Sequence, residues 1–173
     1  MEIKNYALWL IPSGDSYGSL GETIRHYSDR FATPCFEPHI TLVSSIQGSQ
    51  SEIRKKAANI EGCLERFEIT LGKARHSNSF FQCVFLDVTL DAELSRAHDI
   101  ARGMFPVMGP DEYLPHLSLV YGNLPVEERD TIVEDIGGTF CGRILGQNIC
   151  LYLASSDMPP DTWQEIQRYS LGK

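Results

Sequence analysis

The sequence contains no long hydrophobic run. None of its apolar stretches approaches the roughly 20 residues that a membrane-spanning helix needs. The start of the chain, MEIKNYALWLIPSGD, lacks the basic region and the small-residue cleavage site of a secretory signal peptide. We therefore expect an intracellular protein that makes no contact with a membrane.

The cysteine patterns of two classes of protein are missing. The chain has five cysteines, an odd number, and no C-x-x-C pair, which excludes a disulfide framework and a zinc-knuckle spacing. Reduced thiols indicate the cytoplasm, with the nucleus left open, because both compartments keep cysteines reduced. Two of the five, Cys83 and Cys150, lie in apolar stretches and are expected in the core.

Basic side chains are also few. The chain carries 15 Lys and Arg against 23 Asp and Glu, which gives a formal net charge of −8 at pH 7. A protein that tracks a nucleic-acid backbone needs a basic surface to displace counterions. The densest basic cluster here is only Arg54-Lys55-Lys56. We therefore expect no long nucleic acid as a partner, although a few aimed groups can still hold a small anion.

Glycine-rich phosphate loops, low-complexity segments and linkers are missing as well. Gly18 and Gly21 lack the G-x-G-x-x-G spacing and the preceding strand-to-helix turn of a dinucleotide-binding loop. No linker divides the 173 residues, a length that suits one domain burying roughly 70% of its unfolded surface. We expect one domain that spans residues 1–173.

The hydrophobic pattern predicts a mixed α+β fold. Alternation and runs of β-branched or aromatic residues predict strands at residues 4–11, 38–43, 67–71, 80–89, 116–122, 139–145, 149–154 and 163–171. Helical spacing predicts helices at residues 20–31, 49–60, 91–104 and 126–136. Ser49 with Glu52 is a capping box, and Asp91 is an N-cap. Strict alternation would indicate a parallel sheet, whereas the paired strands in the middle and at the end favour largely antiparallel sheets.

One short motif occurs twice, as FEPHITLVSS in the first half of the chain and as YLPHLSLVYG in the second. Alternate side chains of a strand point to the same face. His39 and Thr41 therefore share a face, as do His116 and Ser118, while the apolar residues between them anchor each strand in the core. A single polar pair of this kind is ordinarily a solvent-facing stripe or a satisfied core histidine. Its repetition indicates a function, because a core does not need the polar residues.

Two such strands side by side would bring two imidazoles and two hydroxyls into one cleft. Imidazoles with a pKa near ~6.5 can divide acid and base roles near neutral pH. One takes a proton from an attacking water or hydroxyl, and the other gives a proton to the departing oxygen. The hydroxyls of Thr41 and Ser118 would donate hydrogen bonds to a phosphate held between the imidazoles. His39 and His116 are thus the candidate acid–base pair, and the near-identical motifs leave open which one is the acid.

Two other chemistries fit the sequence less well. A zinc site needs three or four His, Cys or carboxylate ligands, and hydroxyls are poor substitutes. The remaining histidines, His26, His76 and His98, occur singly, and we expect His26 and His98 on helix surfaces. A serine nucleophile at Ser118 would lack the G-x-S-x-G elbow. We therefore expect neither a metal nor a cofactor.

The paired motifs resemble a known group of enzymes. Two P-H-[IL]-[TS]-[LV] segments about half a chain apart resemble the two-histidine (2H) phosphoesterase superfamily. Within it, YALWLIP near the start, FFQCVFL in the middle and PHLSLVYG are most similar to the cyclic nucleotide phosphodiesterases of plants and fungi. The likeness runs from about residue 6 to Tyr121, and more loosely to the region of Trp163.

The resemblance implies a bilobal α+β fold, in which two pseudo-symmetric lobes, each an antiparallel sheet with outer helices, surround a central cleft. It implies metal-independent hydrolysis of ADP-ribose 1″,2″-cyclic phosphate, a by-product of tRNA splicing, to ADP-ribose 1″-phosphate. Nucleoside 2′,3′-cyclic phosphates would be opened to 2′-phosphates. His39 and His116 match the family's acid–base pair, and Thr41 and Ser118 match its phosphate-holding residues.

Three aromatic residues also match positions that look towards the substrate in this family, namely Trp9, Phe81 and Tyr121. Each has a structural alternative, since Trp9 and Phe81 lie in apolar strands and Tyr121 can simply close its strand. We expect a monomer that acts on a small nucleotide. The cysteines depart from the plant pattern, so we expect no disulfide control of the plant type.

Two rival functions remain open. Another branch of the superfamily acts on RNA ends, as a 2′-5′ ligase-like enzyme or an exonuclease, and the acidic charge counts against it. A non-catalytic nucleotide-binding module could use the same cleft, although a binder has little use for two matched imidazoles.

Overall fold

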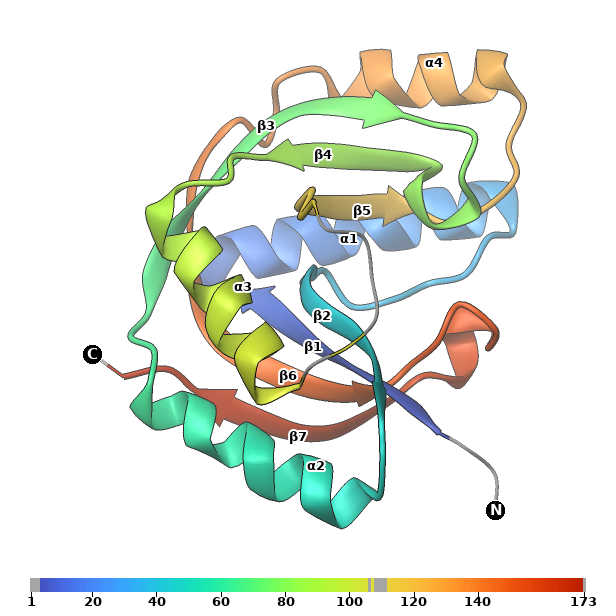
Figure 1. Ribbon diagram of the computed structural model, residues 1–173. Coiled ribbons are helices and arrows are strands. Elements are labelled where there is room, and N and C mark those ends of the chain that lie inside the picture. Colours follow the sequence, from blue (N-terminus) through green and yellow to red (C-terminus); the bar gives the residue numbers. More distant parts are fainter. Residues whose placement is uncertain (1–3, 106, 108–111, 173) are drawn as a thin grey trace.

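Strands and helices interleave along the chain (Figure 1). The computed structural model describes residues 4–105, 107 and 112–172. The strands are β1 (Asn5–Pro12), β2 (Ile40–Gln47), β3 (Phe67–His76), β4 (Val84–Val88), β5 (His116–Val120), β6 (Gly142–Leu153) and β7 (Gln164–Ser170). The helices are α1 (Gly14–Phe31), α2 (Gln50–Ala57), α3 (Ala92–Met104) and α4 (Val126–Ile136). Short 3₁₀ turns are η1 (Ala58–Gly62), η2 (Phe80–Gln82) and η3 (Pro160–Thr162).

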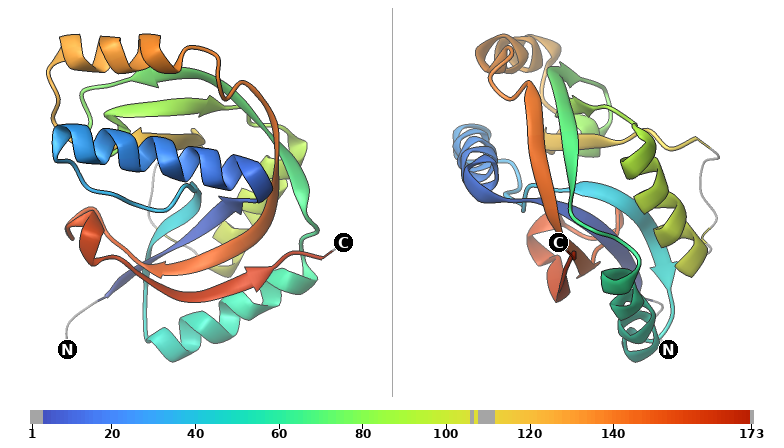
Figure 2. Two further views of the ribbon diagram at one scale, coloured as in Figure 1. Left: turned by 180° about the vertical axis from the view of Figure 1, so that it is seen from behind. Right: turned by 90° about the vertical axis from the view of Figure 1, so that its left-hand side faces the viewer.

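All of these strands belong to one antiparallel sheet, in the order β1-β2-β5-β4-β3-β6-β7. An additional antiparallel pairing joins β1 to β6, so that β1, β2, β5, β4, β3 and β6 close into a barrel-like ring. The strand β7 lies outside this ring and pairs with β6. Figure 2 shows the helices on the outside of the sheet, with α1 and α4 towards one side and α2 and α3 towards the other. The predicted α+β fold with antiparallel pairing is confirmed.

The strand β6 connects the two halves of the sheet. Its first residues, Gly142–Gly146, pair with β3, and Gly146 to Leu153 pair with β1. The sheet is therefore continuous, which corrects the expectation that each of two lobes has a sheet of its own. Gly146 marks the crossing, because it pairs with Phe67 of β3 and with Pro12 of β1. A Cβ atom there would lie 2.9 Å from Cδ1 of Ile69 and 3.0 Å from Cδ1 of Leu10.

Several predicted strand boundaries are wrong, including the end of the strand predicted at 38–43, which continues as β2 to Gln47. Strands predicted at 139–145 and 149–154 form the single strand β6, because the turn-like Gly146 and Asn148 between them remain paired in the ladder. The strand predicted at 67–71 continues to His76. The strand predicted at 80–89 begins instead with the 3₁₀ turn η2, and β4 starts only at Val84.

The loop that carries η2 is held by contacts from several elements. The Ser77 hydroxyl donates to the Gln82 carbonyl at 2.8 Å, and the Gly122 amide donates to the Phe80 carbonyl at 2.9 Å. Arg129 of α4 is buried and donates to the Ser77 carbonyl and to Oδ1 of Asn78. These contacts fix the loop at the end of β5, where it forms a wall of the site described below.

The helix boundaries agree well with the predictions. The Ser49 hydroxyl accepts from the Glu52 amide and donates to Oε2 of Glu52 at 2.6 Å, which confirms Ser49 as the N-cap of α2 and its pairing with Glu52. Asp91 caps α3 by accepting from the amides of Glu93 and Leu94 at 3.1 and 2.9 Å. The helix α1 begins at Gly14, earlier than predicted. The prediction missed its first turns because they are polar and lack the apolar spacing of a helix.

Alternate residues of the central strands face different environments. The motif residues Ile40, Leu42, Leu117 and Leu119 are buried in the main hydrophobic cluster, which confirms that they anchor the two strands. Trp9 belongs to a second, smaller cluster on the other face of β1. The sheet therefore has one face that forms the main core and another face that is available to a site.

The cysteines behave as expected from their sequence context. Cys83 and Cys150 are buried, whereas the other cysteines are exposed, and all of them are free thiols. Across the described residues, no helix combines the length and the apolar character needed to cross a membrane.

Candidate active site

The two histidine motifs meet where β2 and β5 pair. The strands are antiparallel neighbours at the residue pair Ile40–Leu117. A local two-fold axis passes between two paired residues of antiparallel strands. The next residue along each strand points to the opposite face of the sheet from the paired residues. The axis relates His39 to His116, and the two hydroxyl residues to each other. Each histidine thus lies across from the hydroxyl residue of the other motif.

This arrangement brings every predicted site residue to one cavity of about 260 Å³. The residues predicted from the sequence that line it are Trp9, His39, Thr41, Phe81, His116, Ser118 and Tyr121. Further walls come from the other end of β1, from the loop after β6 and from Trp163. None of the described residues that line the cavity is Asp, Glu, Lys or Arg, so its own walls offer imidazoles and hydrogen-bond donors to an anion. A neighbouring cavity that shares Thr41 and His116 with it is also lined by Arg102.

His39 is almost fully enclosed, with 6% of its surface exposed. Its Nδ1 lies 2.6 Å from the carbonyl oxygen of Glu37, and because a carbonyl can only accept, Nδ1 carries the hydrogen. Its Nε2 is therefore the atom that can exchange a proton with a ligand, and it lies 3.5 Å from the Tyr121 hydroxyl. Burial lowers the pKa of His39 to about 4, against the opposing effects of the Glu37 carbonyl and carboxylate.

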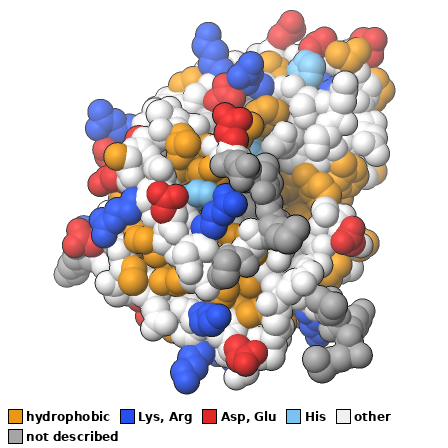
Figure 3. All heavy atoms as spheres, viewed as in Figure 1, with side chains coloured by type: hydrophobic (Ala, Val, Ile, Leu, Met, Phe, Trp, Pro, Cys, Tyr) orange, Lys and Arg blue, Asp and Glu red, His pale blue; other side chains and the backbone are white. Residues whose placement is uncertain are grey.

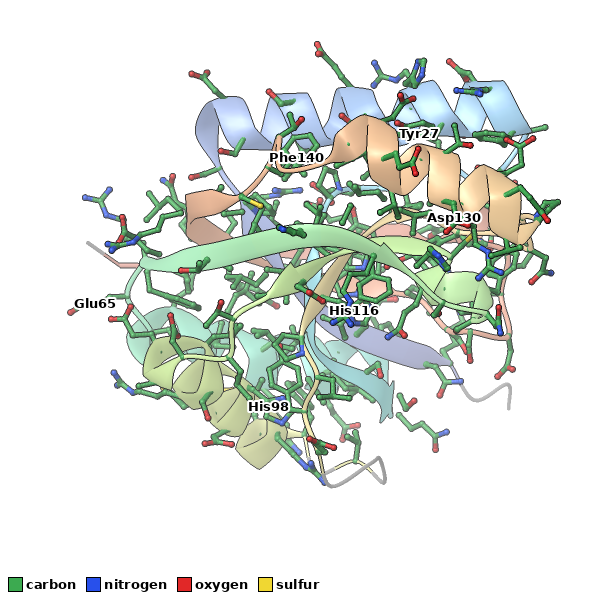
Figure 4. The ribbon with its side chains drawn as sticks, turned by 90° about the horizontal axis from the view of Figure 1, so that it is seen from above. Tyr27, Glu65, His98, His116, Asp130 and Phe140 are labelled. Carbon is green, nitrogen blue, oxygen red and sulfur yellow. The ribbon has the colours of Figure 1, made fainter. Side chains whose placement is uncertain are left out.

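His116 is less enclosed and is bound differently. Its Nδ1 lies 3.2 Å from the carbonyl oxygen of Leu114, and the side-chain nitrogen of Gln82 lies 3.3 and 3.4 Å from the two ring nitrogens. Burial lowers the pKa of His116, and the Leu114 carbonyl opposes this effect. Figure 4 labels His116 beside the ribbons of β3 and β4.

The two hydroxyl residues are in different states. Ser118 is buried, and its hydroxyl donates to the Phe81 carbonyl at 2.8 Å. The hydroxyl must therefore rotate before it can donate to a ligand. Thr41 is partly exposed on the cavity wall, and its backbone carbonyl accepts from the Tyr113 hydroxyl at 2.9 Å, which holds β2 beside the segment that precedes β5.

The aromatic rings around the cavity divide into covered and open ones. Trp9 is stacked between His39, at a centroid distance of 3.6 Å, and Tyr152, at 3.9 Å, so both of its faces are covered. Tyr121 is buried and stacks on Phe36 at 3.7 Å. These two residues offer the cavity an edge and a hydroxyl, respectively, rather than an open ring face.

Two further rings line the cavity from partly exposed positions. Phe81 in η2 and Trp163 after η3 lie nearly parallel, with centroids 5.9 Å apart. The Trp163 indole donates to the Ser155 carbonyl at 3.2 Å, which fixes the ring against the loop after β6. Trp163 and Gln82 were not predicted as site residues. Trp163 lies far along the chain from either motif, and Gln82 sits in a segment that reads as a plain strand.

The remaining histidines lie outside the cavity. His98 is partly buried, with Nδ1 2.7 Å from the Leu42 carbonyl and its ring stacked on Tyr113 at 3.8 Å, so the surface position predicted for it is wrong (Figure 4). This bond ties α3 to β2. His26 is exposed as predicted, and His76 pairs with Asp130 at 2.8 Å. In the part of the chain that is described, no group of three His, Cys, Asp or Glu side chains could hold a metal ion.

Comparison with known proteins identifies a family that this chain matches. The family described as "Cyclic phosphodiesterase-like protein" matches residues 4–140. A cyclic phosphodiesterase of Arabidopsis thaliana is 28% identical over 77% of this chain and 75% of its own length. A 2′,3′-cyclic-nucleotide 3′-phosphodiesterase of Yarrowia lipolytica is 29% identical over 92% of this chain and 96% of its own length.

Solved structures share the fold at low sequence identity. E. coli LigT complexed with 3′-AMP has a TM-score of 0.67 and 14% identity, covering 99% of this chain and 100% of that one. The protein TT0787 of Thermus thermophilus has a TM-score of 0.62 and 12% identity, covering 98% and 99% of the two chains. These likenesses concern the fold alone.

Proposed function

This chain belongs to the cyclic phosphodiesterase-like protein family, and we propose that it hydrolyses small cyclic phosphodiesters with its two histidines. The family recognised from the sequence motifs is confirmed. The proposed substrates are nucleoside 2′,3′-cyclic phosphates, opened to 2′-phosphates, and ADP-ribose 1″,2″-cyclic phosphate, opened to ADP-ribose 1″-phosphate. The observation that carries the proposal is that His39, Thr41, His116 and Ser118 line one cavity around the β2–β5 pair.

The proposed reaction needs one water and no other reactant. A neutral imidazole takes a proton from the water as its oxygen attacks phosphorus. The bond from phosphorus to one ring oxygen breaks, and the other imidazole, protonated, gives its proton to that oxygen. The attacking and leaving oxygens lie on opposite sides of phosphorus, and the local two-fold relation of the motifs provides groups on both sides. We also propose that the two halves of the site are related by the pseudo-symmetry that the resemblance to the family implies.

The hydroxyls would stabilise the charge that develops on the phosphate. Thr41 and Ser118 would each donate to a non-bridging oxygen, Ser118 after rotating away from the Phe81 carbonyl. The Tyr121 hydroxyl, beside Nε2 of His39, is a third donor within reach of the same space. The chemistry therefore rests on side chains of this protein, and we propose that it needs neither a metal nor a cofactor.

The charge of the site supports a small cyclic diester as substrate. In both proposed substrates the cyclic phosphate group carries one negative charge, whereas the monoester group of the product carries about −1.5 to −2 at pH 7. A cavity whose described walls hold no Lys or Arg can balance one charge with an imidazolium and hydrogen bonds. It balances two charges less well, which favours release of the product.

Product analysis on a panel of cyclic phosphates tests the proposal. We expect the wild type to convert nucleoside 2′,3′-cyclic phosphates to 2′-phosphates in the presence of EDTA. His39→Ala and His116→Ala should each lower kcat by about 10²–10⁴-fold while the variants remain folded by circular dichroism. The exposed His26→Ala serves as the matched control and should keep wild-type turnover.

Two outcomes would contradict the proposal. Near-wild-type turnover in either histidine variant would remove the paired-imidazole mechanism. Tight binding of the cyclic phosphate without release of product would favour the non-catalytic binding module.

A further inference from the structure

Glu37 is a largely enclosed carboxylate that the proposed reaction does not use. It lies two residues before His39, and its side chain is 11% exposed. The carboxylate accepts hydrogen bonds from Arg168 at 2.7 Å, from the Tyr17 hydroxyl at 2.9 Å and from the Tyr152 hydroxyl. A charge largely removed from water is costly unless it is paired, and these donors pair it, Tyr17 from an exposed position where water can take its place.

Glu37 and His39 are linked in two ways, directly and through the rings of Trp9 and Tyr152. The backbone carbonyl of Glu37 accepts from Nδ1 of His39. The imidazole stacks on one face of Trp9 with an interplanar angle of 12°, and Tyr152 stacks on the other face with an angle of 24°. The Tyr152 hydroxyl then returns to the Glu37 carboxylate. Glu37 therefore binds the His39 imidazole through its backbone carbonyl and Tyr152, the last ring of the stack, through its carboxylate.

We propose that Glu37, held by Arg168 and Tyr152, is a positioning residue that fixes the orientation of the His39 imidazole for catalysis. The inference rests on the proposed function for one point, namely that His39 takes part in the reaction. It adds β7 to the catalytic centre, because Arg168 is the residue through which that outer strand reaches the motif.

The backbone before β2 explains why such a device is needed. Residues 33–39 form neither helix nor strand, so no ladder of hydrogen bonds fixes the Glu37 carbonyl. The residue is instead fixed through its side chain, by Arg168 on β7 and Tyr152 on β6. A carbonyl that could turn would leave the imidazole free to tilt, and a misplacement of about 1 Å can lower a rate by about 10²-fold.

The arrangement also has an electrostatic effect on His39. Burial raises the pKa of Glu37, but the hydrogen bonds from Tyr152, Arg168 and Tyr17 and the charge of Arg168 outweigh it and keep the carboxylate ionised. That negative charge favours the imidazolium form of His39. The other titratable groups that face His39 from β5 and its end are His116, whose charge disfavours the imidazolium, and the Tyr121 hydroxyl.

A set of three conservative variants tests the proposal through kinetics. Glu37→Gln removes the charge, and Tyr152→Phe removes the hydroxyl but keeps a ring against Trp9. Both should lower kcat by about 10-fold with KM changed less than about twofold, since the substrate contacts remain. Tyr17→Phe is the matched control, because it also removes a tyrosine bond to Glu37 but from an exposed position on α1, outside the ring stack. It should keep kcat within about twofold of the wild type.

A spectroscopic readout separates this proposal from the proposed function. Histidine imidazole ¹⁵N shifts should show His39 with its hydrogen on Nδ1 in the wild type. In Glu37→Gln the pKa of His39 should fall below its wild-type value, and in Tyr152→Phe the preference for that tautomer should weaken. If the wild type turns over none of the cyclic phosphates yet these shifts occur, the function fails and the positioning role stands.

Three outcomes would overturn the positioning role. The first is wild-type kcat in both Glu37→Gln and Tyr152→Phe. The second is a loss in Tyr17→Phe as large as the loss in Tyr152→Phe. The third is a loss of kcat that disappears when each variant is assayed the same number of degrees below its own melting temperature, which would indicate a merely structural role.

Discussion

At the scale of single residues, the two histidines are similar in sequence but unlike in their surroundings. His39 is enclosed between Trp9 and the Glu37 carbonyl, whereas His116 is partly exposed and lies beside Gln82. The motif letters could not reveal this difference, because it comes from residues outside the motifs. It has a consequence for the dependence of activity on pH.

We expect kcat/KM to be highest below pH 6.5, the ordinary pKa of histidine. Burial lowers the pKa of His39 to about 4 and also lowers that of His116. A lowered pKa means that the neutral base persists to lower pH and that the protonated acid is lost sooner as pH rises. Both limbs of the profile of the free enzyme therefore move towards acid.

The same argument gives a different profile for kcat. A bound phosphate carries negative charge, which favours the protonated imidazoles and raises their pKa in the complex. The optimum of kcat should therefore lie at a higher pH than that of kcat/KM. Initial rates from about pH 4 to pH 9 measure both, and a kcat/KM optimum above pH 7 would show that burial does not govern these imidazoles.

The hydroxyl of Thr41 offers a test that hardly changes the shape of the side chain. Thr41→Val replaces the hydroxyl by a methyl group and should lower kcat/KM by about 10²-fold, because a donor to the developing charge is lost. Thr41→Ser keeps the hydroxyl and should stay within about threefold of the wild type. Steady-state kinetics on a nucleoside 2′,3′-cyclic phosphate measure both. Equal losses in the two variants would mean that the methyl group, and not the hydroxyl, matters.

The residues that sequence reasoning missed share a physical feature. Gln82, Trp163 and Glu37 reach the site from loops that lie far along the chain or through a backbone carbonyl. A repeated motif identifies residues that act with their own side chains from regular strands. Contacts that depend on the path of a loop leave no periodic signal.

At the scale of elements, local patterns predicted the type of nearly every helix and strand but not how the sheet closes. The helix caps at Ser49 and Asp91 were readable because capping depends on neighbouring residues. The pairing of β1 with both β2 and β6 joins residues far apart in sequence, and no local pattern encodes it. The resemblance to a bilobal family therefore suggested two sheets where one continuous sheet exists.

Gly146 lies where β6 passes from its pairing with β3 to its pairing with β1. A methyl group there would meet Ile69 and Leu10 at 2.9 and 3.0 Å, closer than packed atoms allow. Gly146→Ala should therefore lower the free energy of unfolding by about 1–3 kcal/mol through overpacking. Urea denaturation followed by circular dichroism measures the change.

A second glycine provides the matched control for this prediction. Gly18 lies inside α1, and a Cβ atom there would meet nothing within 4 Å. Gly18→Ala should raise the free energy of unfolding by about 0.5–1 kcal/mol, because alanine favours the helix. If Gly146→Ala were as stable as the wild type, β6 would have room at its crossing and the sheet could close without glycine.

At the scale of the whole molecule, the net charge and the cavity both favour the small substrate that we propose. The net charge is −8, and basic and acidic side chains are interspersed on the face shown in Figure 3. Only small molecules can use a cavity of about 260 Å³ without also contacting this surface. A longer nucleic acid would extend over it and meet net repulsion.

This repulsion predicts the sign of a salt effect. A protein with a basic groove binds an oligonucleotide more weakly as salt rises, because counterion release then contributes less. Here salt should screen a repulsion, so KM for an oligonucleotide ending in a 2′,3′-cyclic phosphate should fall between about 50 and 500 mM NaCl. KM for the mononucleotide should change less than about twofold, because a single charge is held by short-range contacts inside the cavity.

The comparison of the two substrates decides between a small-nucleotide enzyme and one that acts on RNA ends. At low salt, kcat/KM should be at least about 10-fold higher for the mononucleotide than for the oligonucleotide of the same terminal base. The catalytic groups and the scissile bond are the same in both, so the difference reports the surface and not the chemistry. A higher kcat/KM for the oligonucleotide, weakening as salt rises, would mean that the chain has a nucleic-acid surface and that its substrate is an RNA end.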